Sequence, residues 1–359
     1  MKLLNKILDG DGHVMERDSE LYEYLEPPYS TNKSGMLAYP FFPTLDGFMR
    51  GCVIARLDLH KDYMIDAKVW LDFLDATDTE STVLYPTAAL SVGLIQDLLW
   101  ARAVARAYNN WLVDRFYKVS KRLRGMAILP LQDVPEAVKE LRRAVAELGM
   151  VGACLPANGG ELGVRRGLGH TDFWPVYEEA ERLDVPLVIH GAPSLNLGMN
   201  FNNYFAETQL LEHTLALCIQ FTSVMMGGVL ERFPKLKVGF FEGGVGWVPY
   251  MIDRLDRSFE IFQRQAYREF SPWLKKKPSE YLKSGRVFFT CEGGEPSLSY
   301  TAERIGHGSL IFASDFPHET NLQRAKVEIA EILERRDISD EAKQAILCDN
   351  VGKLYSRVQ

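Results

Sequence analysis

The sequence lacks several features that would assign it to particular classes of protein. Its five cysteines lie far apart with no CxxC pair, which suits reduced thiols in a reducing cytoplasm. No apolar run reaches the ~18 residues of a membrane span, and the N-terminus has no signal-like apolar core. The formal net charge of −7 argues against a nucleic-acid binder. We therefore expect a soluble, cytoplasmic protein that binds neither membranes nor nucleic acid.

The order of strand and helix patterns predicts the fold class. Short β-rich runs alternate with amphipathic helical stretches, as in βα units that build a parallel sheet. Eight strand candidates occupy residues 6–13, 82–86, 124–130, 149–156, 185–190, 237–242, 287–291 and 309–315. Eight such units predict a (β/α)8 TIM barrel, formed as a single domain by residues 1–359, with its chemistry at the C-terminal strand ends. An open doubly wound sheet is the alternative, but "DGDGHV" after the first strand lacks G-x-G-x-x-G.

Two long connections interrupt this alternation. Residues 15–63 follow the first strand and include the aromatic, proline-broken run "YPFFPTLDGF". Connections of that length in compact domains commonly act as lids or binding loops, so we expect a lid here. Its aromatic run would either shield the site from water or form a dimer contact. A second excursion, at about 266–284, precedes the seventh predicted strand.

Ligand-type side chains fall at the predicted strand ends. Asp11 and His13 close the first strand at a spacing of two, so both side chains face the same side. His190, Glu242 and Asp315 close the fifth, sixth and eighth strands. Any one of these residues alone is more often a cap or a satisfied buried polar group than a ligand. Their joint position at one rim predicts a site for Zn²⁺, Fe²⁺ or Mn²⁺, which would also offset the cost of desolvating Glu242.

Four motifs in this order resemble the amidohydrolase superfamily. They are "DGDGH" in strand one, "PLVIHG" in strand five, "GGVLERFPKLKVGFFEGGVGWVPYMIDRLD" around strand six and "FASDFPH" in strand eight. More narrowly, the sequence is similar to the amidohydrolase-related branch that includes aminocarboxymuconate semialdehyde and resorcylate decarboxylases. The resemblance extends over essentially the whole chain.

The resemblance implies roles for individual residues. It implies metal ligation by Asp11, His13, His190 and Asp315, with Asp315 also touching the metal-bound water and moving protons. Family members often carry His-Gly-Gly in strand six, whereas this chain has Glu242 before two glycines. That departure indicates a subgroup with glutamate at this position. It places the usual proton shuttle in doubt and makes a second divalent ion easier to hold.

Three further side chains have two interpretations each. His213 is either a second-metal ligand together with Glu242 or an ordinary histidine of a helix surface or first turn. His318 either contacts substrate as an acid or base or closes the turn after strand eight. Glu292 either lines the mouth or is a solvated loop carboxylate. We assign catalytic roles to Asp315, Glu242 and His318.

A divalent ion lowers the pKa of bound water toward ~7 and so supplies hydroxide at neutral pH. The first functional prediction is therefore a metal-dependent hydrolase that attacks an amide, ester, thioester or lactone, with Asp315 as base. The alternatives are a non-oxidative decarboxylase of a small aromatic acid and a dinuclear iron or manganese oxygenase at Glu242 and His213. The remaining hypothesis is that the chain is a non-catalytic structural subunit.

The cofactor and partner predictions follow from the same residues. We expect zinc first, with iron or manganese as alternatives, and one or two ions. The partners expected are a small, partly apolar substrate and further copies of the chain in a dimer or larger homo-oligomer. A hetero-oligomer with a paralogue is the other possibility.

Overall fold

Eight parallel strands form the centre of the protein. The computed structural model describes residues 6–44, 65–195, 197–199, 202–263 and 273–357. Neighbouring strands pair in chain order, from β1 to β8. Their bounds are β1 (Ile7–His13), β2 (Thr79–Tyr85), β3 (Leu123–Ile128), β4 (Gly152–Pro156), β5 (Leu187–His190), β6 (Val238–Phe241), β7 (Val287–Cys291) and β8 (Leu310–Phe312). The chain just after β8 returns to β1, where the Asp315 amide donates to the Asp11 carbonyl at 3.0 Å. The predicted (β/α)8 barrel is thus confirmed.

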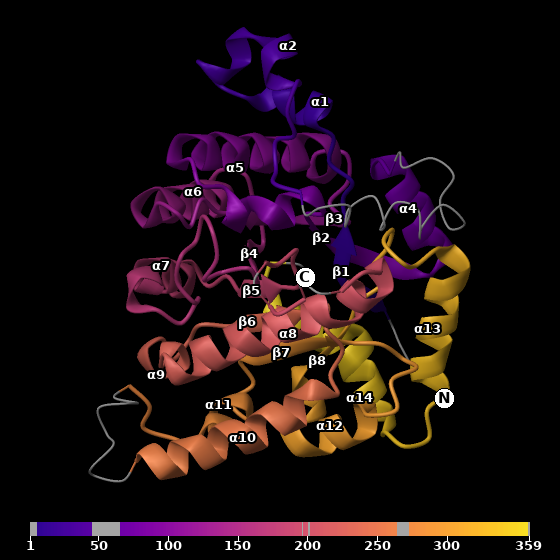
Figure 1. Ribbon diagram of the computed structural model, residues 1–359. Coiled ribbons are helices and arrows are strands. Elements are labelled where there is room, and N and C mark those ends of the chain that lie inside the picture. Colours follow the sequence, from indigo (N-terminus) through magenta and orange to yellow (C-terminus); the bar gives the residue numbers. More distant parts are fainter. Residues whose placement is uncertain (1–5, 45–64, 196, 200–201, 264–272, 358–359) are drawn as a thin grey trace.

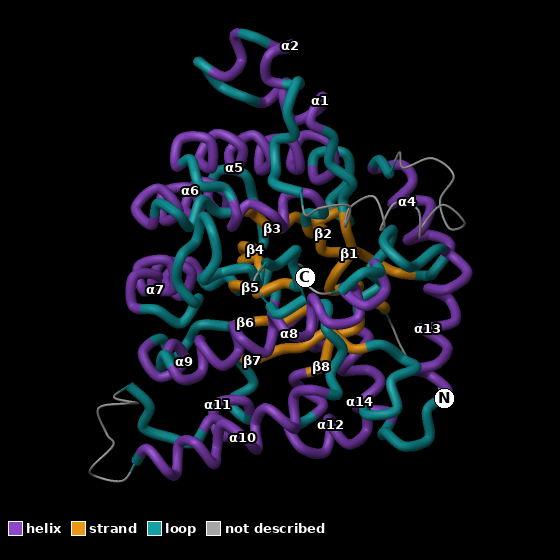
Figure 2. Tube along the Cα trace, viewed as in Figure 1, coloured by secondary structure: helices purple, strands orange, loops and turns teal. Residues whose placement is uncertain are grey.

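Helices surround the strands in the ring that such a barrel requires (Figures 1 and 2). They are α1 (Asp18–Leu21), α2 (Lys33–Met36), α4 (Ala67–Ala76), α5 (Leu98–Leu112), α6 (Val134–Ala146), α7 (Trp174–Leu183), α8 (Phe205–Met226), α9 (Val229–Arg232), α10 (Trp247–Phe262), α11 (Pro278–Leu282), α12 (Leu298–Ile305), α13 (Leu322–Glu334), α14 (Asp340–Gln344) and α15 (Asn350–Leu354). Local sequence sets their starts. The carboxylate of Asp133, for example, accepts from the Glu136 amide at 3.3 Å and caps α6.

Period-two alternation along the strands separates two apolar cores. One set of strand side chains faces inward and fills the barrel, and the C-terminal segment closes this inner core from below. It contains Leu8, Val83, Tyr85, Met126, Cys154, Val188, Phe241, Phe288, Ile311, Val351, Leu354 and Tyr355. The larger second core lies between the strands and the surrounding helices. The candidate metal ligands at the strand ends, called metal-type residues below, lie above the inner core. They are at the opposite end of the barrel from the C-terminal segment.

Four strands (β2, β3, β6 and β8) end earlier than the sequence predicts, and two of these early ends move candidate site residues out of the strand. β6 ends at Phe241 and β8 ends at Phe312, so Glu242 and Asp315 belong to the loops that follow. Both residues have a left-handed backbone, with φ of 64° and 49°. A non-glycine residue at positive φ cannot continue a strand and carries a cost of order 1–3 kcal/mol. Such strain at two candidate site residues is the kind that accumulates at functional sites.

The described part of the expected lid lies beside α5 rather than over the barrel mouth (Figure 1). The Trp100 indole donates to the Phe41 carbonyl at 3.0 Å, and the Phe41 amide donates to the Asp18 carboxylate at 3.0 Å. Both Phe41 and Phe42 are buried. The rest of the aromatic run falls in 45–64, outside the described residues, so its role as a lid stays a prediction. Among the helices of the described ranges, none is long and apolar enough to span a bilayer.

Candidate metal centre at the barrel mouth

Asp11, His13 and His190 form the deepest layer of the site. All three are essentially inaccessible to solvent. The Asp11 carboxylate lies 3.3 Å from Nε2 of His190 and 3.5 Å from Nε2 of His13. Each imidazole is oriented by its other nitrogen, because Nδ1 of His13 lies 2.8 Å from the Pro86 carbonyl and Nδ1 of His190 lies 2.8 Å from the Gly191 carbonyl. Since a carbonyl only accepts, Nδ1 carries the proton in both neutral rings and each Nε2 presents a lone pair.

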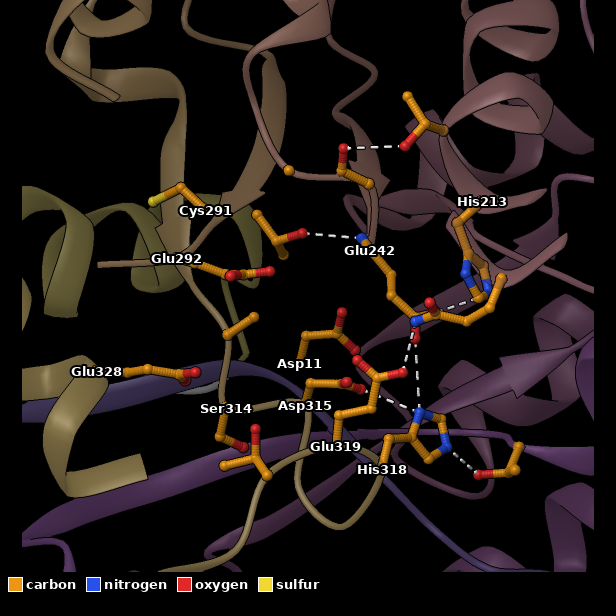
Figure 3. A pocket seen from close by; sticks show the side chains of 18 of the residues that line it. Asp11, His213, Glu242, Cys291, Glu292, Ser314, Asp315, His318, Glu319 and Glu328 are labelled. Carbon is orange, nitrogen blue, oxygen red and sulfur yellow. Dashed lines mark hydrogen bonds and ion pairs between the residues drawn. The ribbon is translucent and has the colours of Figure 1, made fainter. Parts of the chain in front are cut away.

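A second group of ligand-type atoms adjoins the first and shares His13. Nε2 of His13 lies 3.4 Å from the Asp315 carboxylate. Nδ1 of His318 lies 3.0 Å from Asp315 and 3.5 Å from Glu242. Figure 3 shows Glu242, Asp315 and His318 converging on one point at the wall of a pocket. These atoms, like those of the deeper group, all lie within 4.8 Å of one another.

Two buried atoms of this cluster fit a bound cation. Nε2 of His13 and Oε2 of Glu242 have no hydrogen-bond partner in the described structure, although both are shielded from solvent. A buried polar atom left in this state costs about 1–3 kcal/mol, so a native structure normally supplies a partner. The imidazole lone pair and the carboxylate oxygens are all acceptors, so they cannot be partners for one another. A cation between them would be the common partner. The residues present therefore fit a divalent ion with mixed nitrogen and oxygen ligands.

The buried acids and imidazoles of this cluster also shift one another's pKa values. Burial raises the pKa of Asp11 to about 6, despite the opposing effect of His190. For His190 burial alone would lower the pKa, yet Asp11 and Glu242 raise it to about 9. Burial would likewise raise the pKa of Glu242, but His213 and the other surrounding imidazoles hold it well below its usual range. Glu242, just after β6, is thus not an isolated buried charge, because histidines surround it.

His213 belongs to this site, although it is not in either group of closely spaced ligand atoms. It lies within α8, and its Nε2 is 3.6 Å from the Glu242 carboxylate. The ring packs directly on Gly191, where a Cβ atom would come within 2.3 Å of Cδ2 of His213. The glycine after His190 is therefore needed for this close approach. Whether His213 binds a second ion stays a prediction.

Thr87 connects the site to the loop after β2. Its hydroxyl lies 2.6 Å from the Val14 carbonyl and 2.8 Å from Nε2 of His318. Because the hydroxyl has one proton and the carbonyl can only accept, Thr87 donates to Val14 and accepts from Nε2–H of His318. That tautomer leaves the Nδ1 lone pair of His318 facing Asp315. The carboxylate of Glu16 fixes this loop by accepting from the amides of Thr87 and the two residues that follow, each at 3.1 Å.

We expect Thr87→Val to lower kcat by about tenfold, because His318 loses the acceptor that sets its tautomer. Valine keeps the shape of threonine, so bound metal and the melting temperature should change little. Thr87→Ser, which retains the hydroxyl, is the matched control and should restore most of kcat. Steady-state kinetics and metal analysis of both variants test this. Equal kcat in the valine and serine variants would contradict the role of the hydroxyl.

A cavity of about 430 Å³ opens onto these residues. Leu90, Pro193 and Leu210 supply apolar wall, whereas Glu292 and Glu328 extend the acidic character away from the metal-type residues (Figure 3). Glu292 thus lines the mouth, the first of its two interpretations. The remaining described histidines, at 170 and 307, do not line this cavity, and the histidine at 60 lies outside the described residues.

Sequence reasoning missed Asp9, which supports the site from below. Its buried carboxylate accepts from the Thr82 hydroxyl at 2.7 Å and from the Ser314 amide and hydroxyl, both at 2.8 Å. It therefore ties β1 and β2 to the residue preceding Asp315. The signal was available, since Asp9, Asp11 and His13 alternate in "LDGDGH". Thr87 and Glu16 carried no comparable pattern, because only the fold brings Thr87 to His318 and Glu16 to the loop that holds Thr87.

The structure is a parallel eight-stranded barrel with histidine and carboxylate side chains gathered at its C-terminal mouth. This combination defines a class of enzyme scaffold, and comparison with known proteins identifies the family. The sequence pattern of the amidohydrolase family matches residues 71–357, so the chain belongs to that family and is an enzyme. The resemblance of the four motifs to the amidohydrolase superfamily is thereby confirmed.

Individual relatives extend this result. The chain is 29% identical over 286 residues to gamma-resorcylate decarboxylase of Polaromonas sp. JS666, an alignment of 76% of this chain and 82% of the relative. It is 24% identical over 362 residues to 2-keto-4-carboxy-3-hexenedioate hydratase of Sphingobium sp. SYK-6, covering 98% and 96%. Among solved structures, dihydroxybenzoic acid decarboxylase of Polaromonas sp. JS666, with manganese and 2-nitroresorcinol bound, superposes with a TM-score of 0.73 at 23% identity over 98% and 97% of the two chains. That superposition supports the shared fold.

Proposed function

We propose that this protein is a metal-dependent, non-oxidative decarboxylase of a small aromatic acid that carries a hydroxyl group beside its carboxylate. The observation that carries the proposal is the cluster of Asp11, His13, His190 and Asp315 at the mouth of an amidohydrolase-family barrel whose relatives include gamma-resorcylate decarboxylases. These relatives support decarboxylation, the alternative in our sequence analysis, better than they support the hydrolase first predicted. They are the reason to rank hydrolysis second.

For the ion itself we propose manganese ahead of zinc. The donors around the cavity are two kinds of hard or borderline ligand, carboxylate oxygen and imidazole nitrogen, and these suit Mn²⁺ as well as Zn²⁺. Manganese is bound in two solved decarboxylases of this fold. We propose one ion per chain, because the two groups of ligand atoms share His13, whose single Nε2 lone pair serves one ion. Zinc remains compatible with the same ligands.

When bound, the ion would supply a positive charge that holds the carboxylate and neighbouring hydroxyl oxygens and stabilises negative charge developing on the ring. Asp11, His13, His190 and Asp315 would hold it. The leucine and proline side chains of the cavity wall would contact the aromatic ring and exclude water from it.

Decarboxylation replaces the carbon–carbon bond to the carboxylate with a carbon–hydrogen bond, so the site must deliver one proton to the ring and release CO₂. Asp315 is the group we assign to deliver it, since its carboxyl lines the cavity and contacts Nδ1 of His318 at 3.0 Å. His318 would share that proton and receive the next one from solvent. Glu242, held by the imidazoles of the site, would keep the neighbouring histidines oriented rather than act as the acid.

The proposal is tested by CO₂ release from a panel of 2-hydroxybenzoates by the manganese-loaded protein. We expect CO₂ and the matching phenol in equal amounts, and a loss of about 10²–10⁴-fold in Asp315→Asn, which keeps the shape but not the acid. Asp97→Asn, at the start of α5 and outside the cavity, is the control and should retain activity. Ester or lactone hydrolysis without CO₂ release would instead support the hydrolase, and hydration of an unsaturated keto acid would relate the protein to the Sphingobium enzyme.

A further inference from the structure

A second cavity lies at the opposite end of the barrel from the mouth. Its volume is about 480 Å³. Its wall is formed by the N-terminal ends of β1, β2 and β3 and by the C-terminal segment, and it includes Lys6, Glu80, Ser81, Lys121, Arg122 and Arg124. Because all strands are parallel, this end shares no side chain with the metal-type residues. Nothing in the chemistry of the mouth requires it.

Two polar atoms of this cavity are buried without a partner. Ser81 has only 6% of its surface exposed, and its Oγ has no hydrogen-bond partner among the described residues. Nε of Arg124 is likewise buried and without an acceptor there. Strand alternation aims both side chains inward, because Ser81 shares its face with Val83, and Arg124 shares its face with Met126, both members of the inner core. Two orphaned donors that face one cavity call for a common acceptor.

The charges of the cavity favour an anion. Arg122 is already satisfied, since its guanidinium donates to the Asp75 carboxylate at 2.6 Å and to two backbone carbonyls at 2.9 Å. Lys6 lies 3.4 Å from Glu80. Asp349 is the other carboxylate of the lining, and its Oδ1 accepts from the Gln344 side-chain amide at 3.1 Å. By contrast, neither Lys121 nor Arg124 has an ion-pair partner within the described ranges.

The two free cations contact an aromatic side chain instead. Nζ of Lys121 lies 3.6 Å from the centre of the Tyr117 ring, and Nη1 of Arg124 donates to the Tyr117 hydroxyl at 3.0 Å. Contacts of this kind hold cations in place without neutralising them. The guanidinium of Arg124 therefore keeps Nε and Nη2, the paired donors that bind a planar or tetrahedral oxyanion in a bidentate manner.

We propose that this lower cavity is a binding site for a small oxyanion, a phosphate or a carboxylate, held by Arg124 and Ser81 with Lys121 adding charge. Arg124 would donate through Nε, and the Ser81 hydroxyl would donate to a second oxygen of the same anion. The site is separate from the mouth, so an anion bound there does not compete with the substrate for the metal.

Isothermal titration calorimetry of the full-length protein at low ionic strength tests the proposal, with inorganic phosphate and acetate titrated separately. We expect saturable binding of at least one of the two, at one anion per chain. Arg124→Gln should weaken that binding by at least about tenfold, and Ser81→Ala by a smaller factor, because the first removes charged donors and the second a neutral one. Comparison of the two titrations distinguishes a phosphate site from a carboxylate site.

Control variants test whether the measured anion binding occurs at this cavity. Lys139→Gln removes an exposed charge on α6 and should leave the affinity unchanged. His190→Ala alters the mouth and should also leave it unchanged. If Arg124→Gln does not fold, Arg124→Lys keeps the charge without the paired donors and should still weaken binding. Absence of binding by both anions, or equal binding by the wild type and Arg124→Gln, would overturn the proposal and leave the cavity to water.

Discussion

His190→Ala is expected to abolish metal binding and to lower activity by at least about 10³-fold, the scale on which loss of one catalytic component acts. The imidazole lies at the bottom of the cluster with its Nε2 3.3 Å from the Asp11 carboxylate, and solvent does not reach it. The substitution removes a candidate metal ligand. It also removes the imidazole that pairs with the buried Asp11 carboxylate. Elemental analysis of protein purified without added metal measures the loss directly.

The fold should survive this change, because the inner core beneath His190 is apolar and independent of the ion. Circular dichroism checks this. His170→Ala is the matched control, since His170 lies outside the cavity and should keep its full metal content. In Glu242→Gln, one ion per chain should also be retained if the centre is mononuclear, whereas loss of one of two ions would support the dinuclear arrangement. A fully metal-loaded His190→Ala protein would show that His190 is not a ligand.

Asp9→Ala is expected to destabilise the protein by about 3–5 kcal/mol, the range for removal of one partner from a buried polar network. The carboxylate of Asp9 accepts from Thr82, from the amide and hydroxyl of Ser314 and, at 3.3 Å, from the amide of Asp11. Alanine would leave these donors buried without an acceptor. Urea denaturation with the metal removed measures the change without a contribution from ion binding.

Two comparisons define the origin of this effect. Asp72→Ala removes an exposed carboxylate from an ion pair with Lys68 and should alter stability by no more than about 0.5–1 kcal/mol. Asp9→Asn keeps one carbonyl acceptor but turns an amide group toward two donors. Its loss of stability should therefore lie between those of Asp9→Ala and Asp72→Ala. The two Asp9 variants should also lose activity, because Asp9 ties Ser314 to β1 and Asp315 follows Ser314 directly. Unchanged stability in Asp9→Ala would refute the supporting role of this residue.

Much of the fold followed from local rules. Period-two alternation in "LDGDGH" placed the side chains of Asp11 and His13 on one side, as found. The eight strand and helix patterns predicted the barrel, because each strand must bury its apolar face and each helix must cover it. His190 ends β5 as expected. These features need only the neighbouring residues along the chain.

The ends of two strands did not follow from such rules. Glu242 and Asp315 read as final strand residues, yet both lie beyond the strand at positive φ. Left-handed backbone at a residue with a side chain is unfavourable in isolation and persists only where surrounding contacts impose it. Here those contacts are long-range: the Glu242 amide donates to the Thr290 hydroxyl at 2.9 Å, and the Asp315 amide donates to the Asp11 carbonyl.

The sequence by itself determined the barrel and the set of residues that its closure brings to one mouth, because hydrophobic period and residue order are local properties. Only the tertiary structure decided how these residues meet. It placed His213 against Glu242, joined His318 to Thr87 and set Asp9 beneath Ser314. Each of these contacts joins segments far apart in the chain, and their geometry depends on barrel closure rather than on any pattern within one segment.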